Sequence, residues 1–176
     1  IVVRPSPSSN LVWNENTIVG NTVLYGATSG ELFAAGQAGE RFAVRNSGAI
    51  AVVEGCGANG CEYMTGGTVV ILGPVGDNFG AGFTGGMAFV YDADGTFERR
   101  INPDSLIWRP LSHPHWEGVL RDLIARHVQE TGSRFAARLL NEWAMERARF
   151  WHIVPKEYAK YLPVPMEAAA AAVAAE

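Results

Sequence analysis

Hydrophobic residues in the first hundred positions fall into short runs that each follow a glycine. These glycines recur every 18 or 19 residues, at Gly30, Gly48, Gly67 and Gly86. The apolar runs behind them are Glu31–Ala35, Ala49–Val53, Thr68–Leu72 and Met87–Tyr91. Short runs that are rich in β-branched or aromatic residues and bounded by glycine predict buried β-strands.

A second series of glycines advances by the same interval. Its members are Gly20, Gly39, Gly57, Gly76 and Gly95. A unit of 18 or 19 residues is too short to bury its own apolar face, but stacked copies can share one core, so the repeat predicts a solenoid. We expect the nine glycines of both series to be structural, at corners where backbones approach closely or φ is positive. Helical repeats are excluded, because their units are longer and avoid glycine inside helices.

Aligning the runs on their glycines predicts two inward-facing columns of side chains. The first column contains Leu32, Ile50, Val69 and Ala88. The second contains Ala34, Val52, Ile71 and Val90. Both columns would lie on one face of the stacked strands, because residues two apart in a strand share a face.

The segments around these coils extend the prediction in both directions. Ile1–Val3 is expected to be a strand, which suggests that earlier coils are missing. Leu11–Trp13 and Thr17–Val19 would begin the first full coil, and Thr22–Tyr25 would be its second strand. After a turn at Asp92-Ala93-Asp94-Gly95, Phe97–Ile101 is expected to be one more short strand.

The pattern becomes helical after position 102. From Trp116 the apolar residues follow the spacing of one helix face, with Pro114 suited to the first turn and Gly132 to the end. A second helix is predicted from its cap, Ser133, with an apolar stripe formed by Phe135, Leu139, Leu140, Trp143 and Phe150. We expect these helices to form a hairpin that closes the open end of the solenoid.

These patterns divide the chain into three parts. Residues 1–101 form a β-helix domain, and residues 102–165 form a helical cap with at most one further helical turn around Tyr158–Leu162. Residues 166–176 are an alanine-rich tail, which is too short to be a stable isolated helix. We expect the tail to be disordered or to become helical against a neighbour.

Composition narrows the class of protein. Hydrophobic residues make up 48 %, charged residues 18 %, and the formal net charge is −4, which does not favour nucleic acid or an anionic membrane as a partner. No apolar run is long enough to span a bilayer, and Ile1–Pro5 does not resemble a signal peptide. With only two cysteines the chain is not a disulfide scaffold, and we expect it in the cytosol.

Candidate chemistry is sparse. His113 and His115 could supply two ligands to a metal, but no third ligand is evident, so the four histidines are expected to cap or pack. Cys56 and Cys61 are too few for an iron–sulfur cluster and are expected to be buried thiols. The glycine-rich stretch Gly55–Gly60 precedes a strand and not a helix, so it does not fit a phosphate-binding loop.

Charges on the coils are few and scattered. They are Glu31, Glu40, Arg41, Arg45, Glu54, Glu62 and Asp77. A polysaccharide lyase built on a β-helix would have acidic and basic residues clustered on neighbouring coils. Arg41 and Arg45 resemble such a cluster only weakly. We therefore expect these charges to be solvated or to face an interface.

Four stretches of the coils closely resemble the carboxy-terminal GXGXG domain of the glutamate synthase large (alpha) subunit. They are Thr22–Gly36, Glu40–Ala49, Tyr63–Val70 and Asn78–Ala88. The resemblance implies a right-handed parallel β-helix and covers residues 1 to 100 most closely. It also implies that the chain belongs to an oxidoreductase which converts glutamine and 2-oxoglutarate to two molecules of glutamate.

In that family the chemistry belongs to other domains. The amidotransferase domain uses an amino-terminal cysteine, and a barrel domain carries FMN and a 3Fe–4S cluster. This chain begins with Ile1, lacks a third cysteine and shows no alternating βα pattern. The resemblance therefore implies a non-catalytic part that holds both domains in register around the ammonia route, with no cofactor or catalytic residue of its own.

Two other classes stay open. A hexapeptide-repeat acyltransferase also has 18-residue coils, but it would need a six-residue apolar period and a histidine on the coils, where none precedes His113. A coil-forming component of another redox enzyme, such as the formylmethanofuran dehydrogenase component that shares this domain, is the other class, although the helices after Asn102 favour the synthase. Expected partners are the other domains of the same enzyme, the small glutamate synthase subunit, and a second copy that pairs with the exposed edge at Ile1–Val3.

Overall fold

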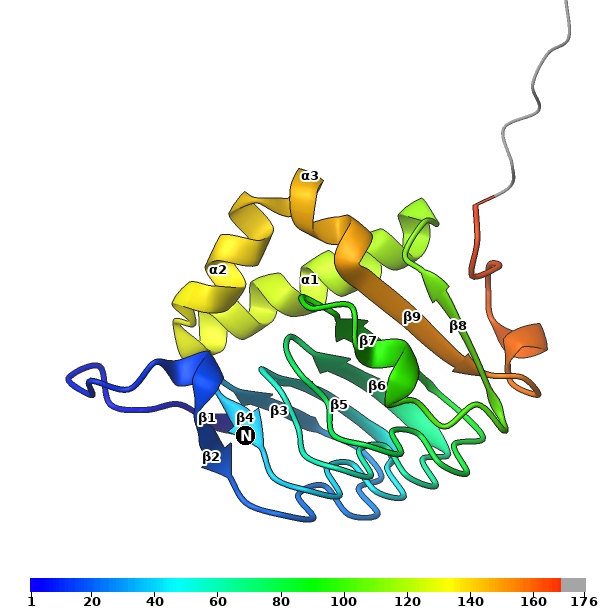
Figure 1. Cartoon of the computed structure of the whole chain (residues 1–176), viewed down its shortest axis with the longest axis horizontal. Coiled ribbons are helices and arrows are strands. Elements are labelled where there is room, and N and C mark those ends of the chain that lie inside the picture. The colour runs from blue at the N-terminus through cyan, green and yellow to red at the C-terminus, as the bar shows by residue number, and fades with distance from the viewer. Residues whose placement is uncertain (169–176) are drawn as a thin grey trace, which may run out of the picture.

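The structure, a computed structural model, describes residues 1–168 and contains a parallel β-solenoid with helices packed on one side (Figure 1). The end of the alanine-rich tail, for which we expect disorder or a borrowed helix, lies outside the described residues. One seven-stranded sheet runs through the described part of the chain. Its strand order is β1 (Val2–Val3), β3 (Glu31–Ala34), β5 (Ser47–Val53), β6 (Gly66–Ile71), β7 (Met87–Tyr91), β9 (Phe150–Pro155) and β8 (Leu106–Pro110).

The first five strands of this sheet pair in parallel, as stacked coils require. A second side of the coil is formed by β2 (Thr17–Val19) and β4 (Gln37–Ala38), which also pair in parallel. Single bridges from Ala38 to Cys56 and from Cys56 to Val75 continue this side across the next coils. The predicted parallel β-solenoid is therefore confirmed.

The third side of each coil has a left-handed backbone at every second residue. In the four coils the residues with positive φ are Thr22, Leu24 and Gly26; Arg41, Ala43 and Arg45; Asn59, Cys61 and Tyr63; and Asn78, Gly80 and Gly82. Amides here bond carbonyls of neighbouring coils, as Thr22 does with Glu40 and Ala43 with Val23. The prediction of a strand at Thr22–Tyr25 is wrong, because φ near +64° at Thr22 lies outside the β region.

The interior of the coils contains two columns of side chains. Register places Leu32, Ala51, Val69 and Ala88 in one column, and Ala34, Val53, Ile71 and Val90 in the other. All eight are buried in one cluster with Phe42, Phe79 and Phe83. The columns predicted from glycine alignment are correct in three coils out of four.

The second coil corrects that alignment. Ile50 and Val52 were predicted to face inward, but Val52 pairs with Phe33 and Val70 in the layer that faces the helices. The cause is a register shift between Ser47 and Ile50, which adds one residue to β5. In this coil Ala49, and not Gly48, lies opposite Gly30.

Asn46 stabilises the extra residue. Its side-chain carbonyl accepts hydrogen bonds from the amides of Gly48 and Ala49, at 3.2 and 2.9 Å, and its amide group donates to the Ala49 carbonyl at 3.0 Å. Because Asn46 is fully buried, these bonds satisfy polar groups that have no access to water.

The two predicted helices are confirmed, with the predicted caps. α1 (Pro114–Thr131) starts with Pro114 and ends at Gly132, whose φ is 73°. α2 (Arg134–Asn141) starts after Ser133, whose hydroxyl accepts a hydrogen bond from the Ala136 amide. The stripe does not continue in one helix, because Glu142 separates α2 from α3 (Trp143–Glu146) and a 3₁₀ turn, η3 (Arg147–Arg149), follows.

From the sequence we expected the helices to close the open end of the solenoid. This prediction is wrong. The helices cover the outer face of the sheet (Figure 1). Trp116, Leu120, Ile124 and Leu139 belong to one buried cluster with Phe33, Val52, Val70 and Phe89. The last coil is instead covered by β9, which runs antiparallel to β7 and pairs with β8. Phe150, predicted on the helical stripe, is the first residue of β9.

Three shorter segments form 3₁₀ turns. Leu11 and Val12 are exposed and form no strand, and a 3₁₀ turn, η1 (Trp13–Glu15), begins at Trp13. The strand expected at Phe97–Ile101 is another 3₁₀ turn, η2 (Phe97–Arg99), because the carboxylate of Asp92 accepts hydrogen bonds from the amides of Thr96 and Phe97. The predicted single turn near Tyr158 is confirmed as η4 (Ala159–Tyr161).

Over residues 1–168, the helices are all too short or too polar to cross a lipid bilayer.

Candidate functional site

The second glycine series lies along one corner of the coils. The amide of Gly57 donates to the carbonyl of Gly39 at 3.1 Å, and the amide of Gly76 donates to the carbonyl of Gly57 at 3.2 Å. A Cβ atom on Gly76 would lie 2.2 Å from the Ala58 amide nitrogen. Gly20 stands at the start of this ladder, whereas Gly95 lies in the turn after β7 with open space around it.

The first glycine series supplies a left-handed residue at the start of three strands: Gly30 and Gly86 directly precede β3 and β7, and Gly67 is the second residue of β6. Gly30, Gly67 and Gly86 have φ between 85° and 90°. A Cβ on Gly67 would lie 2.3 Å from the Ala49 carbonyl oxygen, and one on Gly48 would lie 2.2 Å from that of Thr28. The close approach explains why small residues recur here.

A buried polar cluster joins the coils to the helices. The carboxylate oxygen Oε1 of Glu54, the residue after β5, lies 3.0 Å from Nε2 of His127 in α1 and accepts a hydrogen bond from the hydroxyl of Ser133. Glu54 and His127 are fully buried, and Ser133 is nearly so. Glu54 is thus not one of the solvated or interface-facing charges that we expected from the sequence.

A second polar cluster lies between β7 and the later helices. The Tyr91 hydroxyl donates to Oε2 of Glu146 at 2.6 Å, and Arg138 and Arg149 donate to the two Glu146 oxygens at 3.2 and 3.3 Å. Burial raises the pKa of Glu146, but the bond from Tyr91 and the charges of Arg149 and Arg138 outweigh it, so the net pKa is lowered. Burial, followed by the bond to Glu146, raises the pKa of Tyr91.

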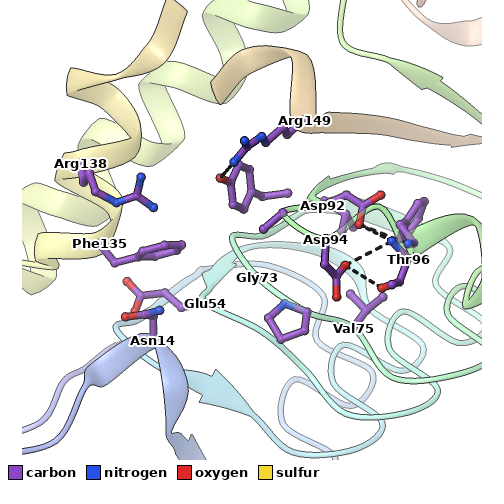
Figure 2. Close-up of a pocket in the computed structure, with 15 residues that line it drawn as sticks. Asn14, Glu54, Gly73, Val75, Asp92, Asp94, Thr96, Phe135, Arg138 and Arg149 are labelled. Atoms are coloured by element: carbon purple, nitrogen blue, oxygen red, sulfur yellow. Dashed lines mark hydrogen bonds between the residues drawn. The ribbon is translucent and has the colours of Figure 1, made fainter. Parts of the chain in front are cut away.

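A cavity of about 340 Å³ opens beside this second cluster (Figure 2). Figure 2 shows Arg138 and Arg149 on the side of the helices, and Asp92, Asp94 and Thr96 on the side of the loop after β7. Apolar groups of Pro74, Val75, Phe97 and Phe135 complete much of its wall. The cavity therefore combines charges of both signs with an apolar lining, as small-molecule sites do.

Sequence reasoning missed the residues of both clusters and of the cavity. One signal for the buried cluster existed: Glu54 directly follows the apolar pair Val52-Val53, and His127 falls on the apolar face of α1. A charge next to a buried strand and a histidine on a buried helix face can complement each other. No comparable pattern pointed to Glu146, because its partners are distant in sequence.

The cysteines and histidines lie where the sequence predicts small thiols and packing or capping rings. Cys56 and Cys61 are free and buried; burial raises the pKa of the Cys56 thiol to about 12 and that of Cys61 well above its usual value. The His113 ring accepts a hydrogen bond from the His115 amide at the start of α1. His152 is buried between Phe89 and Trp116, with ring centroids at 4.7 and 5.0 Å.

No three of the histidine, cysteine, aspartate and glutamate side chains within residues 1–168 converge as ligands for a metal ion.

The glycine-rich stretch Gly55–Gly60 contributes the Cys56 bridge to the second side of the coil. Arg41 lies 3.8 Å from Glu62, and both belong to the third side of the coils. The coils thus supply stacking contacts, and the charged residues of the cavity come mainly from the last coil and the helices.

These features define a glycine-cornered β-solenoid whose sheet is covered by a helical layer. The GXGXG motif family matches residues 1–156, and the chain belongs to this family. Its relatives are glutamate synthases. The chain is 63 % identical over 166 residues to the NADPH glutamate synthase large chain of Azospirillum brasilense, which covers 94 % of this chain and 11 % of the relative.

Two further relatives agree. Ferredoxin-dependent glutamate synthase 1 of Arabidopsis thaliana is 53 % identical over 155 residues, covering 88 % of this chain and 10 % of the relative. The NADPH glutamate synthase large chain of Bacillus subtilis is 44 % identical over 163 residues, covering 92 % and 11 %. The chain thus spans about a tenth of the length of these relatives, and they favour the synthase over the other two classes considered.

Proposed function

We propose that the chain is a non-catalytic structural domain of a glutamate synthase, which makes two glutamates from glutamine and 2-oxoglutarate. In this role it holds the amidotransferase domain and the FMN and iron–sulfur synthase domain in register around the route of ammonia. The observation that carries the proposal is the identity of 63 % to a glutamate synthase large chain across 94 % of this chain.

The physical character of the solenoid supports a scaffold. Successive coils are joined by parallel strand pairing and by the glycine ladder of Gly39, Gly57 and Gly76, where no side chain fits between the backbones. An inner coil makes these contacts with the coil before it and with the coil after it. Its backbone therefore has little freedom to move, and the coils form a stiff body. A stiff body suits the task of fixing the distance between two other domains.

The nucleophile and the cofactors belong, in this proposal, to other parts of the enzyme. Cys56 and Cys61 are buried thiols with raised pKa values, so neither is suited to attack an amide as a thiolate. The FMN and the 3Fe–4S cluster would be held by the synthase domain. The enzyme as a whole would be an oxidoreductase of the cytoplasm.

We also propose that the edge of the sheet at β1 pairs with a partner. β1 pairs with β3 on one edge, and Val2 is 45 % exposed, so the other edge could accept a strand of the small subunit, of the same enzyme or of a second copy. Sedimentation of the chain with and without Val2→Lys tests this pairing. Association that is reduced by the lysine would support it, and a wild-type chain that stays monomeric at high concentration would contradict self-association.

The experiment on catalysis uses the purified 176-residue chain. We expect it to release no ammonia from glutamine and to bind no FMN. Glutaminase activity, or a flavin absorption spectrum that stays with the chain through gel filtration, would contradict the non-catalytic role.

A further inference from the structure

We propose that the cavity beside Tyr91 and Glu146 binds a small zwitterion of the α-amino acid type. Its carboxylate would lie against Arg138 and Arg149, and its ammonium group against Asp94. The inference is independent of the proposed function, because it rests on the cavity and on the groups that line it.

Both arginines have donors to spare. A guanidinium group has five N–H donors. Arg138 uses Nη1 for Glu142 and Glu146, and Arg149 uses Nη1 for Tyr91 and Glu146. Within residues 1–168 neither arginine makes a hydrogen bond through Nε or Nη2. Arg138 also lies over the Phe135 ring, 5.3 Å from its centroid, which keeps the guanidinium at the cavity wall.

The opposite wall can receive a cation. Asp94 uses only Oδ1, which accepts hydrogen bonds from the amide and the hydroxyl of Thr96, and this bonding lowers the pKa of the carboxyl group. Its Oδ2 has no hydrogen bond within the described residues. Figure 2 shows Asp94 across the cavity from the arginines, so charges of opposite sign face the same space.

The balance of charge decides between a zwitterion and a simple anion. Asp92 and Asp94 line the cavity together with the two arginines, and Glu54 lines it as a fully buried residue that is bonded to His127 and Ser133. A dianion would meet attraction on one wall and repulsion on the other. A molecule with both charges meets a partner on each wall, and Pro74, Val75 and Phe135 can contact its carbon atoms. A cavity of about 340 Å³ has the size of a metabolite site.

Titration calorimetry of the 176-residue chain with four probes tests the inference. L-Alanine and L-aspartate carry both charges, succinate is aspartate without the amine, and putrescine is a dication. We expect saturable binding of the amino acids, with a Kd at or below about 1 mM. The affinity for succinate and for putrescine should be at least about tenfold lower, because each loses charge-assisted hydrogen bonds on one wall.

Variants locate the site. Arg138→Gln should weaken L-aspartate about tenfold, and Asp94→Asn should weaken L-aspartate but not succinate, so the preference for the amino acid should fall toward one. Arg147→Gln is the control, because Arg147 belongs to η3, pairs with Glu117 and does not line the cavity. Thermal unfolding of each variant verifies that it is folded.

Three results would overturn the inference. They are no saturable binding of either amino acid to the folded wild-type chain, equal binding of succinate and aspartate, and unchanged binding by folded Arg138→Gln and Asp94→Asn. Amide chemical shifts in nuclear magnetic resonance add a second readout: titration with L-alanine should shift Ala93 and Thr96 at the cavity and leave residues of β2 unchanged.

Discussion

Nε2 of His127 lies 3.0 Å from Oε1 of Glu54, and both side chains are fully buried between the sheet and α1. The contact joins a residue of the second coil to a residue 73 positions later. Because Ser133 bonds the same carboxylate oxygen, one buried group fixes both α1 and the start of α2.

Removing one partner of this contact should lower the free energy of unfolding. Glu54→Ala leaves His127 and Ser133 buried without their partner, and we expect a loss of about 3 to 5 kcal/mol in the free energy of unfolding. The double variant Glu54→Leu with His127→Leu removes both polar groups and should recover much of that loss. Urea unfolding measures each value. Arg126→Gln is the control, because its exposed bond to Glu31 also joins α1 to the sheet but is screened by solvent, so its loss should lower stability far less than Glu54→Ala does.

Glycine substitutions should have opposite signs at the ladder and in the helix. A Cβ at Gly76 would lie 2.2 Å from the Ala58 amide nitrogen, so Gly76→Ala should cost about 1 to 3 kcal/mol or more. Gly118 in α1 has open space at its Cβ, and Gly118→Ala should stabilise by about 1 kcal/mol. Thermal unfolding compares the two. Equal effects would contradict the assignment of Gly76 to a backbone contact.

On the left-handed side of the coils, a change to glycine should raise stability. Arg45 is exposed and has φ of 56°, a conformation that costs an L-residue roughly 1 to 2 kcal/mol. Arg45→Gly should therefore raise stability by up to about 1 kcal/mol after the entropy of glycine is subtracted. Arg121→Gly, on the exposed side of α1, should lower stability by about 1 kcal/mol. Urea midpoints that fall for both variants would contradict the backbone conformation at Arg45.

His152 should make the protein sensitive to acid. Burial lowers the pKa of His152 from 6.5 to about 3. The unfolded chain therefore binds a proton at this residue between these pH values and the folded chain does not, so stability falls as pH drops from 6.5 toward 3. The slope is at most about 1.4 kcal/mol per pH unit.

His152→Phe should remove that slope. Neither ring nitrogen of His152 has a hydrogen-bond partner in the described part of the chain, and phenylalanine can stack on Phe89 and Trp116 in its place. Urea unfolding at several pH values measures the difference between wild type and variant. A slope that is the same in both proteins would show that His152 is not the group responsible; exposed His115→Gln controls for the loss of a histidine.

The coils were predictable because their signal is local and repeated. Glycine spacing and the apolar run after each glycine defined four strands, and Pro114, Gly132 and Ser133 defined the helix ends. The register of the second coil was not predictable from spacing, since Gly48 lies beside a bulge that Asn46 stabilises. A one-residue shift moved Ile50 and Val52 from the interior to the face under the helices.

Three further errors, at Phe150, Glu54 and Glu146, have a tertiary cause. Phe150 continues a helical apolar spacing, but it pairs with Tyr91 in the sheet, which a local pattern does not reveal. Glu54 and Glu146 are buried because their partners come from distant segments. The cavity likewise combines the loop after β7 with arginines on α2 and η3, so it exists only in the folded chain.

In the proposed role this solenoid positions the catalytic domains of a glutamate synthase, and coupling between those domains in the full-length enzyme tests the role. The measurement is the ratio of glutamate formed to glutamine hydrolysed, in wild type and in Gly76→Ala. If the solenoid is a scaffold, the ratio should fall in Gly76→Ala while glutamine hydrolysis and glutamate formation from added ammonia both persist. An unchanged ratio in a variant enzyme whose solenoid is shown by proteolysis to be loosened would contradict the scaffold role.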